Sequence, residues 1–366
     1  MSWYSEMRHT ISSQPLRWKI PFGRENLYED QTMKKRVLLL HTGGTLGMAG
    51  ETPRPSSTGE PVGILGPSSS AINTLLQRIP ELSDIAELRI EILARQDSCD
   101  IRASQWLTWA ERIRQETWAD GIVLIHGTDT MVYTASILSF LLEERERPII
   151  LTGSQRPLSA VRTDARQNLV DATILACGPL REVTLCFDSL GLRGNRALKR
   201  SSAAMGAFDS PNCPPLATLG VDIHYANHSL SAAGTPRALA LSDHVRLTWV
   251  MPDLPAPEPW RVERPAVHIL AAFGSGNFPL QTGWQALLDA ERKAGITHLV
   301  VSQCPHGSVI PGLYLTSQAV FERDAISGGD MSYIAAIAKA RVGLGQKLEG
   351  PALRHYLESN IAGERS

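Results

Sequence analysis

The stretch Arg36-Val-Leu-Leu-Leu-His-Thr-Gly-Gly-Thr45 decides the fold of this chain. Its apolar residues form a short continuous run that ends at a pair of glycines, which is typical of a strand buried on both faces of a sheet. Two later segments, 121–126 and 148–152, have the same character, and each precedes a segment with helical apolar spacing, most clearly 130–144. Strands that alternate with helices predict βαβ units and therefore a parallel sheet.

The rest of the chain predicts a second α/β unit. Segments 268–271 and 297–302 have the character of strands, and 283–294 between them has helical spacing. The Ser-, Ala-, Gly- and Pro-rich stretch before them suits a linker. We therefore expect an α/β protein with a larger N-terminal parallel-sheet domain with flanking helices and a smaller C-terminal α/β domain. The expected boundaries are an N-terminal extension at 1–32, to which we assign no role, a first domain with the active site at 33–226, a linker at 227–244 and a second domain at 245–366.

The composition indicates a globular protein that acts on a small molecule. Lysine and arginine total 36 against 37 aspartates and glutamates, so no basic field favours nucleic acid or an anionic membrane. No stretch approaches the roughly 18 apolar residues of a membrane span, and the first residues lack the apolar region of a secretory signal. The five cysteines are scattered without a Cys-x-x-Cys pair, which fits reduced thiols. We expect a cytoplasmic protein.

Polar residues gather where the predicted strands of the first domain end, at 42–45, 127–130 and 152–155. In an open parallel sheet, ligands bind beyond the carboxyl ends of the strands. Glycines there let backbone N–H groups approach a ligand closely. The segments match neither GxxxxGK[ST] nor GxGxxG, which disfavours a nucleotide. The stretch 52–70 is longer than ordinary βα loops and is expected to be a lid or binding loop, with a disordered insertion as the alternative.

Four ordered segments resemble the signatures of the bacterial L-asparaginases, closest to the cytoplasmic type I group. Two shorter segments, Phe273-Gly-Ser-Gly-Asn277 and Gln303-Cys304, fit the smaller domain of that family, so the resemblance runs from about residue 34 to the C-terminus. The four signatures are His41-Thr-Gly-Gly-Thr-Leu-Gly-Met48, Ile125-His-Gly-Thr-Asp-Thr-Met131, Thr152-Gly-Ser-Gln-Arg-Pro157 continued by Arg162-Thr-Asp164, and Arg193-Gly-Asn-Arg-Ala-Leu-Lys199.

The resemblance implies an L-asparagine amidohydrolase that uses no cofactor and no metal. Thr45 would attack the side-chain amide carbon, release ammonia and leave a β-aspartyl ester. A threonine hydroxyl is a weak nucleophile and needs a base within hydrogen-bond reach. The resemblance assigns that work to Thr128, Asp129 and Lys199. Lys199 is the only lysine in a long stretch that otherwise uses arginine, which supports a specific role.

The resemblance also implies which groups hold the substrate. Segment 96–100 resembles the family's loop that grips the α-carboxylate and the α-amine, with Ser98 on the carboxylate and Asp129 on the ammonium. Backbone amides at the turns of Thr128 and Ser154 would stabilise the oxyanion. The family forms homodimers or homotetramers, and an oligomer is expected here. The expected substrate-binding residues are Gly44, Asp97, Ser98, Cys99, Thr128, Asp129 and Ser154.

The histidines favour structural roles. His224 and His228 have helical spacing, but no third ligand accompanies them, which disfavours a metal site. His41 and His126 end buried strands, where hydrogen-bonded structural histidines are more common than general bases. Asp97 and Asp100 lie in one loop, and each is as consistent with an ordinary surface carboxylate as with a substrate-binding residue.

Two departures from the family qualify the expected activity. Family members usually carry a tyrosine in the lid, but no tyrosine lies between Tyr28 and Tyr133. Either another group, such as one in the run 56–58, replaces it, or its role in orienting the nucleophile is lost. Some type I enzymes bind a second asparagine through an arginine and a cysteine. Cys304 is present, but Ala271 stands where that arginine is expected, so the effector site is predicted to be absent or altered.

Three rival functions remain. The first is a glutaminase, whose substrate has one more methylene than asparagine. One methylene lets an enzyme discriminate between two substrates by only about 1–3 kcal/mol. The related amidase subunit that supplies ammonia for tRNA-dependent transamidation usually carries an N-terminal domain larger than the segment before Met33. A catalytically weakened amino-acid-binding sensor would fit the missing lid tyrosine.

Overall fold

The structure is a computed structural model that describes residues 34–44, 77–143, 146–227, 230, 237–262, 265–279 and 283–366. Residues 34–366 form one compact unit. Three parts of the expected site and chain lie outside the described residues: the extension at 1–32, the nucleophile Thr45 and the loop at 52–70. None of the helices in the described ranges is long and apolar enough to cross a membrane.

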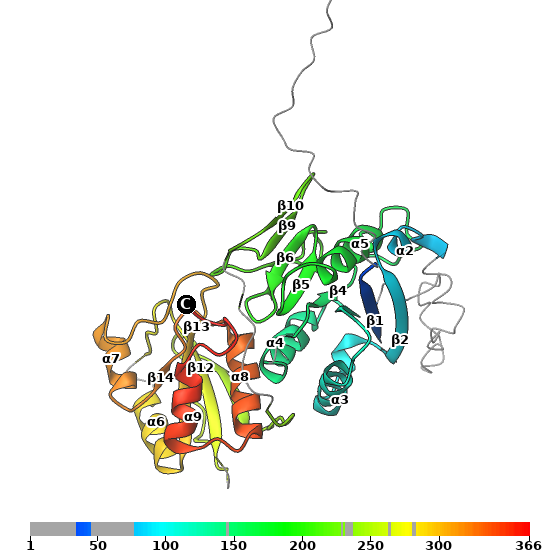
Figure 1. Cartoon of the computed structure of the whole chain (residues 1–366). Coiled ribbons are helices and arrows are strands. Elements are labelled where there is room, and N and C mark those ends of the chain that lie inside the picture. Colours follow the sequence, from blue (N-terminus) through cyan, green and yellow to red (C-terminus); the bar gives the residue numbers. More distant parts are fainter. Residues whose placement is uncertain are drawn as a thin grey trace, which may run out of the picture. The chain divides into compact units, whose positions relative to one another are not determined.

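The larger sheet has eight strands in the order β10-β9-β6-β5-β4-β3-β1-β2 (Figure 1). Neighbours among β1 to β5 pair in parallel, which confirms the predicted parallel sheet, whereas β6, β9 and β10 extend it with antiparallel pairing that the sequence did not predict. The strands are β1 (Arg36–Gly43), β2 (Glu87–Gln96), β3 (Gly121–Ile125), β4 (Ile149–Thr152), β5 (Val183–Phe187), β6 (Leu190–Arg193), β9 (Ala217–Leu219) and β10 (Ile223–Tyr225).

Helices cover both faces of this sheet. The core on one face includes residues of α3 (Ala103–Arg114) and α4 (Met131–Leu141), and the core on the other includes residues of α2 (Leu82–Ile85) and α5 (Ala165–Ala176). Successive residues of β1 alternate between the two cores, because side chains along a strand point to opposite faces. Burial on both faces explains why this strand is a continuous apolar run.

The smaller sheet contains four parallel strands in the order β11-β12-β13-β14. Two of these strands and one helix were predicted, at 268–271, 297–302 and 283–294, and they are confirmed. The elements are β11 (Val245–Trp249), β12 (Ala266–Ala272), α6 (Trp284–Lys293), β13 (Ile296–Ser302), α7 (Leu315–Phe321), β14 (Ile326–Ser327), α8 (Tyr333–Gly345) and α9 (Gly350–Glu358).

Helix α8 contributes to the cores of both sheets. Ile334, Ala338 and Val342 lie four residues apart and join the core of the larger sheet. Ala336 and Ala340, on another side of the helix, join the core of the smaller sheet. A helix that is apolar on all sides is a buried helix. Helix α8 therefore connects the smaller sheet to the core that contains α4, the helix that begins next to the predicted site. The residues at which one domain ends and the next begins remain a prediction.

Candidate active site

Three turns meet at the carboxyl edge of the larger sheet, after β1, β3 and β4. A Cβ atom added to Gly44 would lie 2.6 Å from the Cα of Gly127, and one added to Gly127 would lie 2.7 Å from the Ser98 side chain. A Cβ on Gly153 would lie 2.2 Å from the carbonyl oxygen of His126. Gly44 also has a φ of +87°, which side chains rarely adopt. These close approaches require glycine and bring together residues from distant motifs.

Lys199 lies between two residues of the turn after β3. Its Nζ donates a hydrogen bond to Thr128 Oγ1 at 2.8 Å and contacts Asp129 Oδ1 at 2.6 Å. The Lys199 side chain is 15% exposed, whereas that of Asp129 is 65% exposed. Thr128 Oγ1 in turn donates to Gln155 Oε1 at 3.1 Å. Gln155 belongs to a quoted motif, but no role was predicted for it.

The turn after β4 is held by the start of α5. Asp164 accepts hydrogen bonds from the backbone N–H groups of Gln155 and Arg156, at 2.8 and 3.0 Å. Asn168 donates to the carbonyl oxygen of Gly153 at 3.0 Å. Within the described part of the chain, the hydroxyl of Ser154 is buried and has no hydrogen-bond partner. The Arg162-Thr-Asp164 motif therefore has a visible function, which is to fix the turn that carries Ser154 and Gln155.

The loop after β2 supplies Ser98 to the same edge. Asp97 accepts a hydrogen bond from the backbone N–H of Cys99 at 2.8 Å and so caps the short 3-10 helix Ser98–Asp100. Ser98 is buried, and its carbonyl oxygen accepts from Thr130 Oγ1 at 2.8 Å. Cys99 is exposed, and the hydrogen bond and charge of Asp97, followed by burial and the charges of Asp129 and Asp100, raise the pKa of its thiol. Its thiol is therefore protonated at neutral pH and is a weak nucleophile.

His126 is a structural residue, as expected. Its Nδ1 lies 2.7 Å from the carbonyl oxygen of Gly127, and its Nε2 lies 2.8 Å from Thr134 Oγ1, which accepts from Trp106 Nε1 at 2.8 Å. Burial lowers the pKa of His126 to about 4, so the ring is neutral at pH 7 and donates from Nδ1 to the carbonyl oxygen. This chain of hydrogen bonds fixes the backbone immediately before Thr128.

His41 is also neutral at pH 7. Burial, with the nearby charge of Arg95, lowers its pKa to about 4. Its Nδ1 accepts from the backbone N–H of Gly43 at 3.1 Å, while its Nε2 has no partner among the described residues. His41 therefore orders the turn that leads to Thr45, and its low pKa makes it a poor proton acceptor.

The histidines with helical spacing, His224 and His228, are not part of a group of potential metal ligands among the described residues. His224 is exposed on β10, and His228 lies outside the described residues. Within the described ranges, one group could hold an ion, His268, Glu291 and His298 of the smaller domain. Glu291 Oε2 lies 2.7 Å from His268 Nδ1 and 3.0 Å from His298 Nε2, so these side chains hydrogen-bond to one another.

Comparison with known proteins identifies relatives of the whole arrangement. Residues 36–231 match the family model described as Asparaginase, N-terminal, and residues 264–357 match the Glutaminase/Asparaginase C-terminal domain. L-asparaginase 1 of Escherichia coli (strain K12) is 33% identical over 341 residues, which cover 90% of this chain and 98% of that protein. A glutamyl-tRNA(Gln) amidotransferase component of Methanobrevibacter smithii is 28% identical over 366 residues, which cover 94% of this chain and 80% of that protein.

A solved structure shows the same fold. L-asparaginase I from Vibrio cholerae aligns with a TM-score of 0.76 and 30% identity, over 91% of this chain and 99% of that one. The fold, the order of the motifs and the two family models agree along most of the chain, which confirms the resemblance to type I asparaginases. The chain therefore belongs to the asparaginase family.

Proposed function

We propose that the protein hydrolyses L-asparagine to L-aspartate and ammonia. One observation carries the proposal: Lys199 Nζ is within hydrogen-bond distance of both Thr128 Oγ1 and Asp129 Oδ1. These groups lie at the sheet edge where the turn after β1 leads into Thr45. A hydroxyl with a lysine beside it can act in proton transfer, which a threonine nucleophile requires. The L-asparaginase relatives support the same chemistry.

The proposed reaction has two halves. Thr45 Oγ attacks the side-chain amide carbon, the C–N bond breaks, and the amide nitrogen takes up a proton and leaves as ammonia. Water then attacks the resulting β-aspartyl ester, and the ester oxygen returns to Thr45 as a hydroxyl. Lys199 and Thr128, whose Nζ and Oγ1 atoms lie 2.8 Å apart, pass on the proton that the Thr45 hydroxyl loses. Gln155 Oε1, which accepts a hydrogen bond from the Thr128 hydroxyl, orients that hydroxyl.

The substrate is proposed to lie among the meeting turns. Asp129 Oδ1 contacts Lys199, and its other oxygen pairs with the substrate α-ammonium. Ser98 donates to the α-carboxylate, with Asp97 and Cys99 shaping that loop. Backbone N–H groups of the turns at Thr128 and Ser154 stabilise the oxyanion, and Gly44 lets the substrate approach the backbone. The charge pattern suits a free amino acid.

Ammonia release tests the proposal. The purified protein is assayed with L-asparagine, L-glutamine and D-asparagine, beside the variants Thr45→Ala and Lys199→Met. We expect ammonia from L-asparagine and loss of activity in both variants. Full activity of Thr45→Ala would refute the nucleophile. Faster hydrolysis of L-glutamine would favour a glutaminase or a transamidation enzyme, and binding without ammonia release would favour a sensor.

The cellular setting and assembly belong to the same proposal. We propose a cytoplasmic homodimer or homotetramer that engages neither nucleic acid nor membrane, with a linker at 227–244 between its two domains. The composition and the family relationship support this. Sedimentation velocity of the purified protein distinguishes the oligomers, and a monomer at assay concentration would contradict the proposal.

The asparagine effector site is proposed to be absent or altered. Ala271 is completely buried in β12, and a methyl group cannot pair with a carboxylate as an arginine does. Cys304 is exposed at the end of the neighbouring strand. We expect a hyperbolic dependence of rate on asparagine concentration, whereas a sigmoidal curve would overturn this proposal.

A further inference from the structure

Lys199 lies on a short strand outside the larger sheet. It belongs to β7 (Leu198–Lys199), which pairs with β8 (Phe208–Asp209) in a two-stranded sheet separate from the larger one. Phe208 of β8 and Ala197, just before β7, are buried in the core of the larger sheet. The turn before β7 leads directly into Lys199, so the contacts of that turn also bear on where the Lys199 side chain lies.

That turn is held by residues 360–366, which we call the C-terminal segment. Asn195 is completely buried and donates from Nδ2 to the carbonyl oxygen of Ala362 at 2.8 Å. Arg196 is also buried, and its Nε donates to the carbonyl oxygen of Gly363 at 2.8 Å. Its Nη1 pairs with Asp330 Oδ2 at 2.8 Å. The C-terminal segment lies beyond the residues that match the C-terminal family model.

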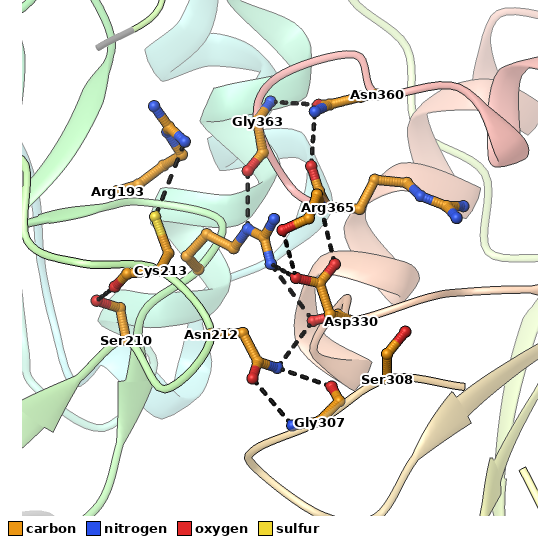
Figure 2. A network of polar contacts seen from close by, with 12 residues as sticks. Arg193, Ser210, Asn212, Cys213, Gly307, Ser308, Asp330, Asn360, Gly363 and Arg365 are labelled. Carbon is orange, nitrogen blue, oxygen red and sulfur yellow. Dashed lines mark hydrogen bonds and ion pairs between the residues drawn. The ribbon is translucent and has the colours of Figure 1, made fainter. Parts of the chain in front are cut away.

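The C-terminal segment packs directly against the turn. Gly363 has a φ of +74°, and a Cβ atom there would lie 2.8 Å from the guanidinium of Arg193. Ser366 donates from its backbone N and its hydroxyl to the carboxylate of Asp330, at 2.9 and 2.8 Å. Asp330 thus joins Arg196 to the end of the segment, and Figure 2 shows Asp330 in this network beside Gly363 and Arg365.

The C-terminal segment is itself internally braced. Glu364 is completely buried, accepts from the backbone N–H groups of Ile361 and Ala362, and forms a 2.5 Å ion pair with Lys339 of α8. Asn360 accepts from the backbone N–H of Gly363 at 2.8 Å and donates to the carbonyl oxygen of Arg365 at 2.6 Å, as Figure 2 shows. Because these bonds close the segment into a fixed turn, its carbonyl oxygens are rigid acceptors.

We propose that residues 360–366 position the Lys199 ammonium against Thr128 by holding Asn195 and Arg196. Asn195 and Arg196 are positioning residues, since they act through the backbone of the 193–199 segment. The role in catalysis rests on the proposed hydrolysis of asparagine, whereas the placement of Lys199 can be tested without any substrate. The smaller domain thereby takes part in building the active site of the larger one.

Two variants and one control test this. Arg196→Met removes the contacts of the guanidinium with Gly363 and Asp330, and Asn360→Ala loosens the C-terminal segment without changing any residue of the 193–199 turn. Val301→Ala, in the core of the smaller sheet, lowers stability and leaves the network intact. For each protein, kcat and KM are measured per folded molecule well below the melting temperature. A pulse of methyl acetimidate, read by mass spectrometry, gives the labelling rate of Lys199 relative to the exposed Lys347.

We expect kcat of Arg196→Met to fall at least about tenfold with KM little changed, because a misplacement of about 1 Å can cost about 100-fold in rate. Lys199 should be labelled several-fold faster, and Asn360→Ala should show both effects more weakly. Val301→Ala should show neither. Wild-type kcat and labelling in Asn360→Ala would overturn the proposal, as would equal changes in Val301→Ala. If Arg196→Met does not fold, Asn360→Ala decides.

The two proposals fail in different ways. A wild-type protein that releases no ammonia removes the proposed function, but the labelling rates still report whether the C-terminal segment holds Lys199. Conversely, unchanged labelling beside full asparaginase activity leaves the function intact and removes the positioning role.

Discussion

Two polar clusters of this chain differ in what surrounds them. Lys199, Thr128 and Asp129 lie at the rim of the larger sheet, where the Asp129 side chain is 65% exposed. His268 and Glu291, with His298, lie inside the smaller domain, where no side chain of the three is more than 2% exposed.

Their hydrogen bonding differs as well. Both oxygens of Glu291 are used inside the protein, since Oε1 accepts from the backbone N–H of Trp260 at 2.8 Å and Oε2 contacts both histidines. At the rim, one oxygen of Asp129 contacts Lys199, and the buried Ser154 hydroxyl has no partner within the described ranges. Completely paired buried groups maintain structure, whereas groups with bonding capacity left over can bind a substrate. The rim cluster should therefore control the rate of hydrolysis, and the buried cluster should control the free energy of unfolding.

The replacement Lys199→Met should separate rate from stability most clearly. Removing a group that transfers protons typically lowers a rate by about 100- to 10,000-fold, so we expect asparagine hydrolysis to fall about 1,000-fold. The free energy of unfolding should change by less than about 1 kcal/mol, because exposed ion pairs contribute about that much at most and Asp129 is largely exposed. Ammonia assays and urea unfolding measure the two quantities. A large loss of stability would mean that the rim cluster is structural.

Glu291→Ala should have the opposite effect. It leaves His268 and His298 buried without their shared acceptor, and a buried group left without its hydrogen-bond partner typically costs about 1–3 kcal/mol. We expect unfolding to need about 3 kcal/mol less free energy, with kcat per folded molecule unchanged. Glu322→Ala, at the end of a helix, is the matched control and should change stability by less than about 0.5 kcal/mol. A lower kcat in Glu291→Ala would contradict the comparison.

Acid should weaken the buried cluster and the backbone beside the rim cluster, which His126 braces, in different pH ranges. Burial holds the pKa of His126 at about 4 in the folded protein, below its usual 6.5. Between these values the unfolded chain binds more protons, so stability falls as pH falls from 6.5 to 4, by about 1.4 kcal/mol per pH unit. Burial alone would raise the pKa of Glu291, but hydrogen bonds from His268 and His298 outweigh it and lower that pKa from 4.5 to about 2. The contribution of Glu291 is therefore lost as pH falls from 4.5 to 2.

Urea unfolding at a series of pH values checks both ranges. Between pH 6.5 and 4, the free energy of unfolding should depend less steeply on pH in His126→Gln than in the wild type. The difference in slope should correspond to about one bound proton. Glu291→Gln should remove the change in slope that the wild type shows between pH 4.5 and 2. Equal slopes in His126→Gln and the wild type would show that His126 is not held neutral.

The sequence predicted strands whose residues are almost all buried. Strands β1, β3 and β4 are buried on both faces and therefore stand out as apolar runs. Strand β2 lies at the edge of the sheet, where charged and apolar residues alternate over 87–92, so it has the pattern of a half-buried strand and not a continuous apolar run. Strands β9 and β10 have three residues each, too few for a periodicity.

The site shows the same limit. Thr128, Asp129 and Lys199 could be named through the family motifs, but the contact of Gln155 with Thr128 arises only because the turns after β3 and β4 meet. His268 and His298 stand opposite each other on β12 and β13, a pairing that spacing along the chain does not reveal. Thr45 and the loop at 52–70 lie outside the described residues and stay predictions.

The smallest expected effect concerns the loop between the rim and the solvent. Asp97 caps the turn that places Ser98, so Asp97→Ala should loosen Ser98 and raise KM for asparagine about fivefold, since losing an N-cap typically costs about 1 kcal/mol. Asp97→Asn should keep KM near the wild-type value, because asparagine caps as well as aspartate does. If both variants raise KM equally, the charge of Asp97 acts on the substrate directly. That outcome would extend the rim cluster outward and make Asp97 a binding residue rather than a cap.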